Sequence, residues 1–457
     1  MSPLQHLNQP RRDGGDGHGR GLAGIRAAGF PVAIERTMRA LSLAALLSAG
    51  LAGPAPAQEN ALGSNVLGLL EYARAQSPEL AAMRQEADAA AQRVQPAGAL
   101  PDPVLRVELM NMSEWVNETS RSLLPWRLGE TKYTLMQTLP GWGKRDLKRD
   151  AAAADARQAS ARIGAGWADL ASRIKATYAE YYGAAGNERL TREVLDLMAR
   201  LEQIAQARYS GGLVAQQDAI RAQLEQTAMR SELIALDNQK RQLRARMNAL
   251  LARDGAAALA EPQQIRPLPT LATMDAPVLV ERARAGNPAL QAELARLAAA
   301  QKSRDLTLRN RSPDFQVGVS PTQLRSRITS WGLMLEMNIP LQQESRRSQE
   351  QEAESMVNAA RSRSEALSYQ LLGELSGQLA AFDAARRTEA LVKAQLLPQS
   401  ELSLQSALAA YESGKVDFAT LLDAQRQIRK ARQDLLKAEV DTQMRLADIE
   451  RILGEDL

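Results

Sequence analysis

Few residues of this chain could carry catalytic or metal chemistry. Its 457 residues include two histidines, His6 and His18, and no cysteine. Both histidines precede a predicted export signal, so we expect the mature chain to contain neither residue type. This excludes Cys/His metal sites, Ser-His-Asp triads, cysteine nucleophiles and disulfides, as well as the acylated cysteine of a lipoprotein.

The remaining candidates for chemistry are weak. Gly143 and Lys144 lack the preceding glycine spacing of a phosphate-binding loop, which argues against nucleotide binding. Met110 and Met112 could offer soft thioether ligands to a cuprous ion, although packing is the commoner role of methionine. Carboxylates are numerous on predicted helices, and no base, nucleophile or metal cluster stands out. The sequence therefore predicts a protein that is not an enzyme and has no cofactor.

The N-terminal region has the features of an export signal. Met38 and Arg39 precede an apolar run from Ala40 to Leu51, and Ala55-Pro56-Ala57 is a small-x-small cleavage pattern. We expect residues 38–57 to be a signal peptide and Gln58 to begin the mature chain. Residues 1–37 are rich in Gly and Arg, which is unlike a signal peptide, and we interpret them as an upstream extension with translation starting at Met38.

Charge and hydropathy narrow the class of protein further. Residues 1–57 carry six of the 57 basic and three of the 53 acidic residues, which leaves 51 and 50 in the mature chain. This near-neutral balance gives no electrostatic reason to expect nucleic-acid binding. No apolar stretch of 18 or more follows the leader, so the sequence predicts no transmembrane helix. Aromatic residues make up only 4%, and Ala, Leu, Gln, Arg and Glu dominate, which favours long helices.

The mature chain is an internal duplication. "LLEYARAQSPEL" at residues 69–80 and "LVERARAGNPAL" at residues 279–290 share seven of twelve positions. Pro140 corresponds to Pro340, and "YSGGLV" at 209–214 corresponds to "YESGKV" at 411–416. Ordered landmarks at offsets of 210, 200 and 202 are hard to obtain by chance. We therefore expect two structural repeats, residues 58–270 and 271–457.

Each repeat is predicted to open with a capped helix and to continue as a strand hairpin. Ser77 or Asn287 is the expected N-cap, with proline at the first helical position. Alternating apolar and polar residues then predict two strands per repeat with one apolar face, typical of membrane strands, and ordinary soluble hairpins are the alternative. The expected apolar face comprises Leu105, Val107, Leu109, Tyr133, Leu135, Leu139, Phe315, Val317, Val319, Trp331, Leu333, Leu335, Met337 and Ile339. Trp115, Trp126 and Trp331 fall at strand ends, as a membrane-interface aromatic girdle requires.

A long helical hairpin follows the strands of each repeat. We expect helices over roughly residues 142–208 and 342–411, each followed by a shorter return helix. Glycine ends the long helices at Gly212 and Gly414, with Val214 and Val416 opening the return. Four strands cannot close, and a lipid-facing sheet with open edges leaves backbone groups unsatisfied, so several copies must combine. Three chains would supply twelve strands.

This order of elements, with "YSGGLV" and "YESGKVDFATLLDAQ" at the turns, resembles the TolC-like outer-membrane efflux proteins over about residues 62–455. "LLPQS" at residues 396–400 resembles a usual break in the preceding helix of that family. The resemblance implies a mainly α fold with a small β part, in which duplicated helical hairpins and two β-hairpins trimerise into a 12-stranded outer-membrane β-barrel and a periplasmic α-barrel. It further implies a homotrimer in the outer membrane of a Gram-negative bacterium, in contact with outer-membrane lipid. The expected partners are a periplasmic adaptor (membrane fusion protein) and an inner-membrane RND pump.

The resemblance also implies site residues. Asp423 falls where such ducts carry an acidic periplasmic gate ring, and Thr420 stands at the companion position that is usually acidic. Asp423 could equally be a solvated or tip-capping carboxylate. The adaptor-docking tips are expected at Tyr209, Gly212, Leu213, Val214, Tyr411, Gly414 and Val416. For the glycines, simple turn geometry is an equal alternative.

The substrate is indicated by the strand-to-helix junction. "QTLPGWGKRDLKRDAAAADA" resembles the heavy-metal branch of the family, so we expect passive export of heavy-metal cations. A drug or small-molecule duct of the same fold is one alternative. A periplasmic coiled-coil adaptor or scaffold is another, but an adaptor would show one helical hairpin flanked by β-rich modules, and a scaffold would not need alternating strands.

Overall fold

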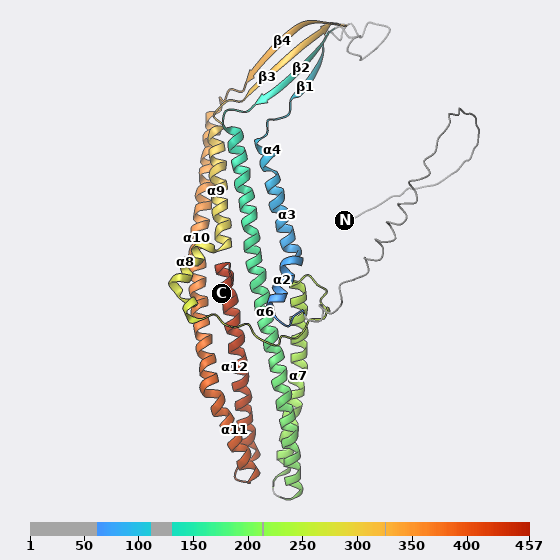
Figure 1. The fold of residues 1–457 in the computed structure, drawn as a ribbon, viewed down its shortest axis with the longest axis vertical. Coiled ribbons are helices and arrows are strands. Elements are labelled where there is room, and N and C mark those ends of the chain that lie inside the picture. The colour runs from blue at the N-terminus through green and yellow to red at the C-terminus, as the bar shows by residue number, and fades with distance from the viewer. Residues whose placement is uncertain (1–61, 111–129, 213, 325) are drawn as a thin grey trace, which may run out of the picture. The chain divides into compact units, whose positions relative to one another are not determined.

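The computed structural model describes residues 62–110, 130–212, 214–324 and 326–457, and the elements below carry the labels of Figure 1. The predicted signal peptide and upstream extension lie outside these ranges. All described residues belong to one compact unit, 57–457. Within it, long helices run alongside one another and one small sheet lies at the end of the helices (Figure 1).

The predicted helix caps are present in both repeats. Helix α2 (Val66–Gln76) leads to α3 (Pro78–Gln92) and the short α4 (Val94–Gly98), and α8 (Ala276–Gly286) leads to α9 (Pro288–Arg309). Ser77 Oγ accepts the Leu80 N–H at 3.3 Å, and Asn287 Oδ1 accepts the Leu290 N–H at 2.7 Å. A side-chain oxygen thus satisfies one free N–H at the start of α3 and of α9, which confirms the prediction.

The long helical hairpins are also confirmed. Helix α6 (Lys144–Ser210) has 67 residues and returns as α7 (Gln216–Leu250). At 1.5 Å per residue, α6 extends about 100 Å. In the second repeat α10 (Gln343–Leu391) continues through a π-helical segment, η4 (Val392–Leu396), into α11 (Leu397–Glu412) and returns as α12 (Phe418–Leu453). The return helices begin two residues later than expected, at Gln216 and Phe418 instead of Val214 and Val416.

The expected break at residues 396–400 is a change of helical pitch. Pro398 has no N–H to donate and its ring displaces the preceding turn, so the helix cannot keep regular i to i−4 hydrogen bonding there. The five residues of η4 absorb this change, and α11 begins at Leu397 without a turn between them. The helix therefore continues through the proline instead of ending.

The four strands form one antiparallel sheet in the order β1-β2-β3-β4 (Figure 1). Their bounds are β1 (Val104–Met110), β2 (Glu130–Leu139), β3 (Phe315–Leu324) and β4 (Arg327–Met337). The pairs β1-β2 and β3-β4 are the expected hairpins. The pairing of β2 with β3 joins the two repeats and does not follow from the sequence pattern.

The faces of this sheet differ as the alternation predicts. Leu105, Leu135, Val319 and Leu333 lie opposite one another across all four strands, and all are exposed. The other face includes Met136, Gly318, Ser320 and Thr322, which are buried. An apolar face left exposed by the chain itself is the mark of a surface that meets lipid or another protein.

Repeat 1 and repeat 2 lie side by side along the whole unit. Beside the sheet, contacts run in the order α3, α6, α9, α10, and toward the far ends of the hairpins in the order α7, α6, α12, followed by α10 and α11. Three apolar clusters stabilise these layers, one around α2 and α6, one at the hairpin ends, and one around α8, α10 and α12. None of the helices in the described residues is long and apolar enough to cross a bilayer.

Candidate functional site

The candidate site is the pair of helix turns at the ends of the two hairpins, which we call the tips. The first tip joins α6 to α7, and the second joins α11 to α12. Gly212 has φ +74° and Gly414 has φ +73°, a left-handed conformation that favours glycine. A Cβ atom at Gly212 would meet no described atom within 4 Å. The backbone conformation alone therefore explains why glycine is needed at Gly212.

An aromatic pair packs the second tip. The rings of Tyr411 and Phe418 lie 5.6 Å apart at 65°, edge to face. Phe418 is fully buried, and Tyr411 is only 1% exposed. Burial raises the pKa of the Tyr411 hydroxyl. Because its ring is buried within the subunit, Tyr411 holds the tip together, and its role in adaptor docking remains a prediction.

Arg208 connects the two tips. Its guanidinium lies over the Tyr411 ring, 5.0 Å from the centroid, and its Nη1 donates a hydrogen bond to the Tyr411 carbonyl oxygen. A Cβ atom at Gly414 would come 3.3 Å from Nη2 of the same arginine. We call this set of contacts the arginine latch. Sequence reasoning missed Arg208, although a basic residue in the last turn before the glycines was a signal.

Carboxylates surround the latch. Asp417 caps α12, accepting from Thr420 N at 3.0 Å and from Thr420 Oγ1 at 2.6 Å, and these hydrogen bonds lower its pKa. On α7, burial raises the pKa of Asp218, the nearby Asp417 raises it further, and Arg221 opposes the change. Thr420, the residue at the companion gate position, is thus engaged in helix capping.

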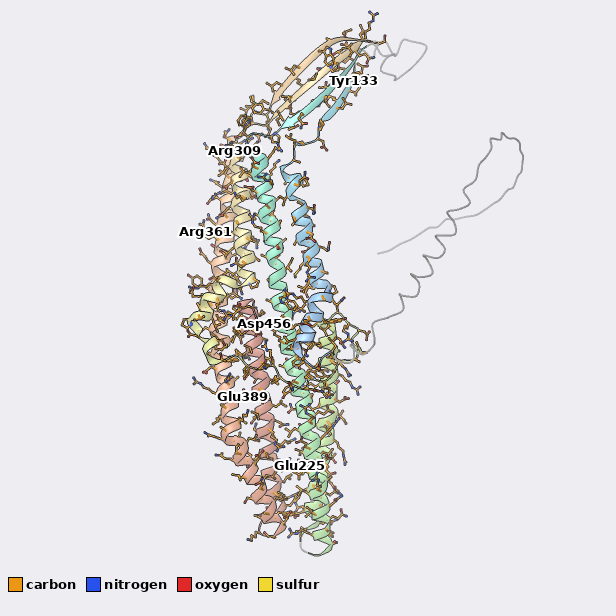
Figure 2. The ribbon with its side chains drawn as sticks, in the orientation of Figure 1. Tyr133, Glu225, Arg309, Arg361, Glu389 and Asp456 are labelled. Carbon is orange, nitrogen blue, oxygen red and sulfur yellow. The ribbon has the colours of Figure 1, made fainter. Side chains whose placement is uncertain are left out.

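Asp423 lies on the second turn of α12 and does not cap the tip. Its side chain is 69% exposed, and its Oδ1 lies 3.7 Å from Nη1 of Arg426. Arg426 also pairs with Glu225, which lies on α7 (Figure 2). An exposed carboxylate with one basic neighbour is compatible with a gate ring, and its position in that ring remains a prediction.

Comparison with known proteins identifies the family. The model of the family "Outer membrane efflux protein" matches residues 69–253 and 279–455, one segment in each predicted repeat. The chain belongs to this family. Over 395 residues it is 24% identical to the cobalt-zinc-cadmium resistance protein CzcC of Cupriavidus metallidurans, covering 84% of this chain and 88% of that protein.

Solved structures share the fold of this outer membrane efflux protein. The outer-membrane channel OprN matches with a TM-score of 0.72 at 18% identity, covering 85% of this chain and 89% of that one. CusC matches with a TM-score of 0.73 at 16% identity, covering 89% and 96%. VceC from Vibrio cholerae matches with a TM-score of 0.72 at 18% identity, covering 86% and 96%.

The other predicted site residues of this family member fall in several places. Tyr209, Gly212 and Gly414 are exposed at the tips, and Val214 and Val416 are half-buried. Trp331 is exposed on β4. Trp115, Trp126, Met112 and Leu213 lie outside the described residues, and Met110 ends β1. In the part of the chain that the structure describes, no three His, Cys, Asp or Glu residues converge on a metal position.

A buried ion network lies away from the tips, and the sequence does not predict it. Glu450 on α12 accepts from Lys175 Nζ on α6 at 2.7 Å and from Arg266 Nη1 at 2.8 Å. The side chains of Glu450 and Lys175 are 2% and 5% exposed. Asp456 also contacts Lys175, and the Leu457 N–H donates to Glu450. The network joins the C-terminal residues to the long helix of the first repeat.

Proposed function

We propose that this protein is the outer-membrane subunit of a tripartite RND-type efflux system, a passive duct that carries substrate from the periplasm to the exterior. One observation carries the proposal. In the sheet, β1 of repeat 1 and β4 of repeat 2 are the two edge strands. The helices beside the sheet and those toward the ends of the hairpins likewise have repeat 1 at one edge and repeat 2 at the other. Such unlike edges join head to tail, and when the rotation closes they form a ring.

Lipid makes this closure necessary. The exposed apolar face of the sheet suits hydrocarbon, where the unpaired N–H and C=O groups at the edges of β1 and β4 would each cost several kcal/mol. Joining β4 of one copy to β1 of the next removes every edge. Three copies of the four-stranded sheet give twelve strands, an even number suited to an outer-membrane barrel, while the helical layers extend into the periplasm. The duct itself performs no catalysis.

The substrate we propose is heavy-metal cations. The relative CzcC is named for cobalt, zinc and cadmium resistance, and the junction sequence beginning at Gln137 points the same way. A ring of Asp423 carboxylates at the tips would favour cations. An adaptor and an inner-membrane pump would engage the exposed tip residues, among them Tyr209. The alternative is a small-molecule duct of the same fold; a scaffold would leave the exposed sheet face unexplained.

The contact between repeats within one chain predicts the contact between chains. Strand β4 corresponds to β2 at an offset of 200, given by Pro140 and Pro340, which follow these strands. Strand β3 corresponds to β1 at an offset of 212, given by Asp102 and Asp314, which precede them. Within the chain, Leu135 on β2 faces Val319 on β3. The equivalent contact between subunits therefore places Leu335 on β4 opposite Val107 on β1 of the next copy. Opposed Cα atoms lie about 4.5–5.5 Å apart, a separation that a disulfide bridges.

Because the chain has no cysteine, this contact is tested with the double substitution V107C/L335C. Oxidation of outer membranes should yield a covalent trimer on denaturing gels, and the single substitution L335C should not. A shifted pair, L105C/L335C, should cross-link more weakly. Monomers alone from V107C/L335C would contradict the ring.

In a host lacking its own duct, restored tolerance to zinc, cobalt or cadmium supports the metal assignment, and restored tolerance to organic drugs alone overturns it.

A further inference from the structure

A tryptophan is held on a rigid turn between β2 and α6. Trp142 is 84% exposed, yet the turn that carries it is fixed. The Gly141 N–H and Lys144 Nζ both donate to Asp314 Oδ1, at 2.7 and 2.8 Å, and Gly143 adopts φ +81°. The Lys144 side chain is buried. An indole that a fixed turn holds in solvent indicates a binding partner more strongly than an indole on a mobile loop does.

Exposed aliphatic residues lie at the same end of the helices. Ile339 and Leu341, in the segment between β4 and α10, are 60% and 80% exposed. They continue the alternation of Leu333 and Leu335, which lie on the exposed apolar face of β4. The apolar surface of the sheet therefore extends past the last strand residues to the first turn of the helices.

Basic side chains border this apolar surface. Arg309, which ends α9 beside the sheet (Figure 2), donates from Nε to the Trp142 carbonyl oxygen at 2.7 Å. Arg145, Lys148 and Arg149 are exposed on the first turns of α6. Residues 141–150, 309–314 and 339–350 together hold eight Lys or Arg and five Asp or Glu. Some of the acidic residues pair with these basic side chains. Asp146 and Asp150 lie 3.7 and 4.0 Å from the Arg149 guanidinium, and Glu350 pairs with Arg311.

The position within the subunit keeps Trp142 accessible after assembly. The strands β2 and β3 are the inner strands of the sheet, and α6 and α9 are the inner helices beside it. Neighbouring copies join at β1 and β4, so the turn between β2 and α6 is flanked on both sides by its own chain. A second copy is therefore not the partner of this indole.

We propose that this junction band, formed by Trp142, Ile339 and Leu341 with Arg309, Lys148 and Arg149, binds anionic phospholipids of the inner leaflet of the outer membrane. The proposal rests on the duct function and adds a lipid ligand to it. Indole rings favour the headgroup region, and lysine and arginine reach lipid phosphates while their stems stay on apolar surface.

The first test locates Trp142 in the bilayer. The full-length protein is reconstituted into nanodiscs containing phosphatidylglycerol that is brominated near the headgroup, which quenches nearby indoles. The chain has five tryptophans. The W142F variant should lose part of the quenchable emission, whereas the W167F variant should lose none of it. Trp167, on α6, is covered by the Arg74 side chain and packs against a core cluster. Equal quenching of wild type and W142F overturns the proposal.

The second test measures lipid preference by native mass spectrometry of the trimer. Phosphatidylglycerol should be retained over phosphatidylcholine, and R309Q should reduce this preference by about fivefold, the effect of one basic residue at an anionic surface. The control is R387Q, whose arginine is exposed on α10 and paired with Asp383 at 2.8 Å. An unchanged preference in R309Q refutes the lipid role. If the chain forms no trimer at all, the proposed duct has failed instead.

Discussion

Replacing Arg208 by alanine should unlock the two tips of each subunit. The change removes a charged hydrogen bond to the Tyr411 carbonyl and a cation–π contact at 5.0 Å. The first is worth about 1.5–3 kcal/mol and the second about 0.5–1 kcal/mol. Because Arg208 is half-buried, we take the lower ends, which sum to about 2 kcal/mol. That value shifts the closed-to-open equilibrium of each subunit by about thirtyfold.

Two measurements read this shift. In planar bilayers, R208A should raise the open probability of single channels. In hydrogen exchange, the backbone amides of residues 209–218 and 411–420 should exchange faster, while those of the sheet should not change. The matched control R387A removes an exposed arginine of α10 that pairs with Asp383, and it should leave both readouts at wild-type values. A trimer of R208A with unchanged open probability and unchanged exchange would refute the latch.

Tyr411 supplies a companion test of the same reasoning. Its hydroxyl is buried and has no hydrogen-bond partner among the described residues, so Y411F keeps every contact that the latch uses. We expect Y411F to match wild type in both assays. Y411A removes the ring beneath Arg208 and beside Phe418, and it should destabilise the tip by about 3–5 kcal/mol. Opening of the channel by Y411F would show that the hydroxyl, and not the ring, matters.

Three further predictions concern other charged residues. E450A leaves the buried Lys175 without its buried carboxylate partner, so thermal unfolding should show a loss of about 3–5 kcal/mol, and an unchanged midpoint would contradict the network. Burial raises the pKa of Asp218 in the folded state, so the folded protein keeps this proton to a higher pH than the unfolded chain does. The contribution of Asp218 to stability is therefore present at low pH. It is lost as the pH rises from the pKa of the unfolded state through the higher pKa of the folded state. D218N should flatten this decline in unfolding scans taken upward from the ordinary pKa of an aspartate. D423A should lower the cation-to-anion permeability ratio, measured from reversal potentials, and an unaltered ratio would remove Asp423 from the pore.

The features that the sequence predicts correctly are encoded locally. Ser77 and Asn287 each precede a proline, and the cap uses a side chain and an N–H only three residues apart. The strands follow from a period of two, which places Leu333 and Leu335 on one face whatever lies beside them. Element order, helix length and the duplicated plan can therefore be predicted from the residues alone. The turn glycines are equally predictable, because their positive φ is a property of the turn itself.

The missed features depend on how the two repeats pack. Lys175 and Glu450 are 275 positions apart, and nothing in either local sequence indicates a buried pair. Pairing of β2 with β3 depends on which edges meet, which alternation alone does not determine. The motif around Tyr411 marks the turn and so suggests a docking surface, but a motif does not report burial. Arg208 and Tyr411 come together only when both hairpins are in place.

The duplication also indicates where the duct should open. At the tips the repeats correspond at an offset of 202, so Tyr209 matches Tyr411 and Arg208 matches Ala410. Within a chain, the latch joins the repeat 1 tip to the repeat 2 tip. Between chains, the repeat 2 tip meets the next repeat 1 tip with alanine at the arginine position, and alanine cannot make the charged contacts. The contacts between subunits are therefore weaker at this position than those within subunits. We expect opening to begin between neighbouring subunits, and to be complete only when the Arg208 contacts within each subunit also break.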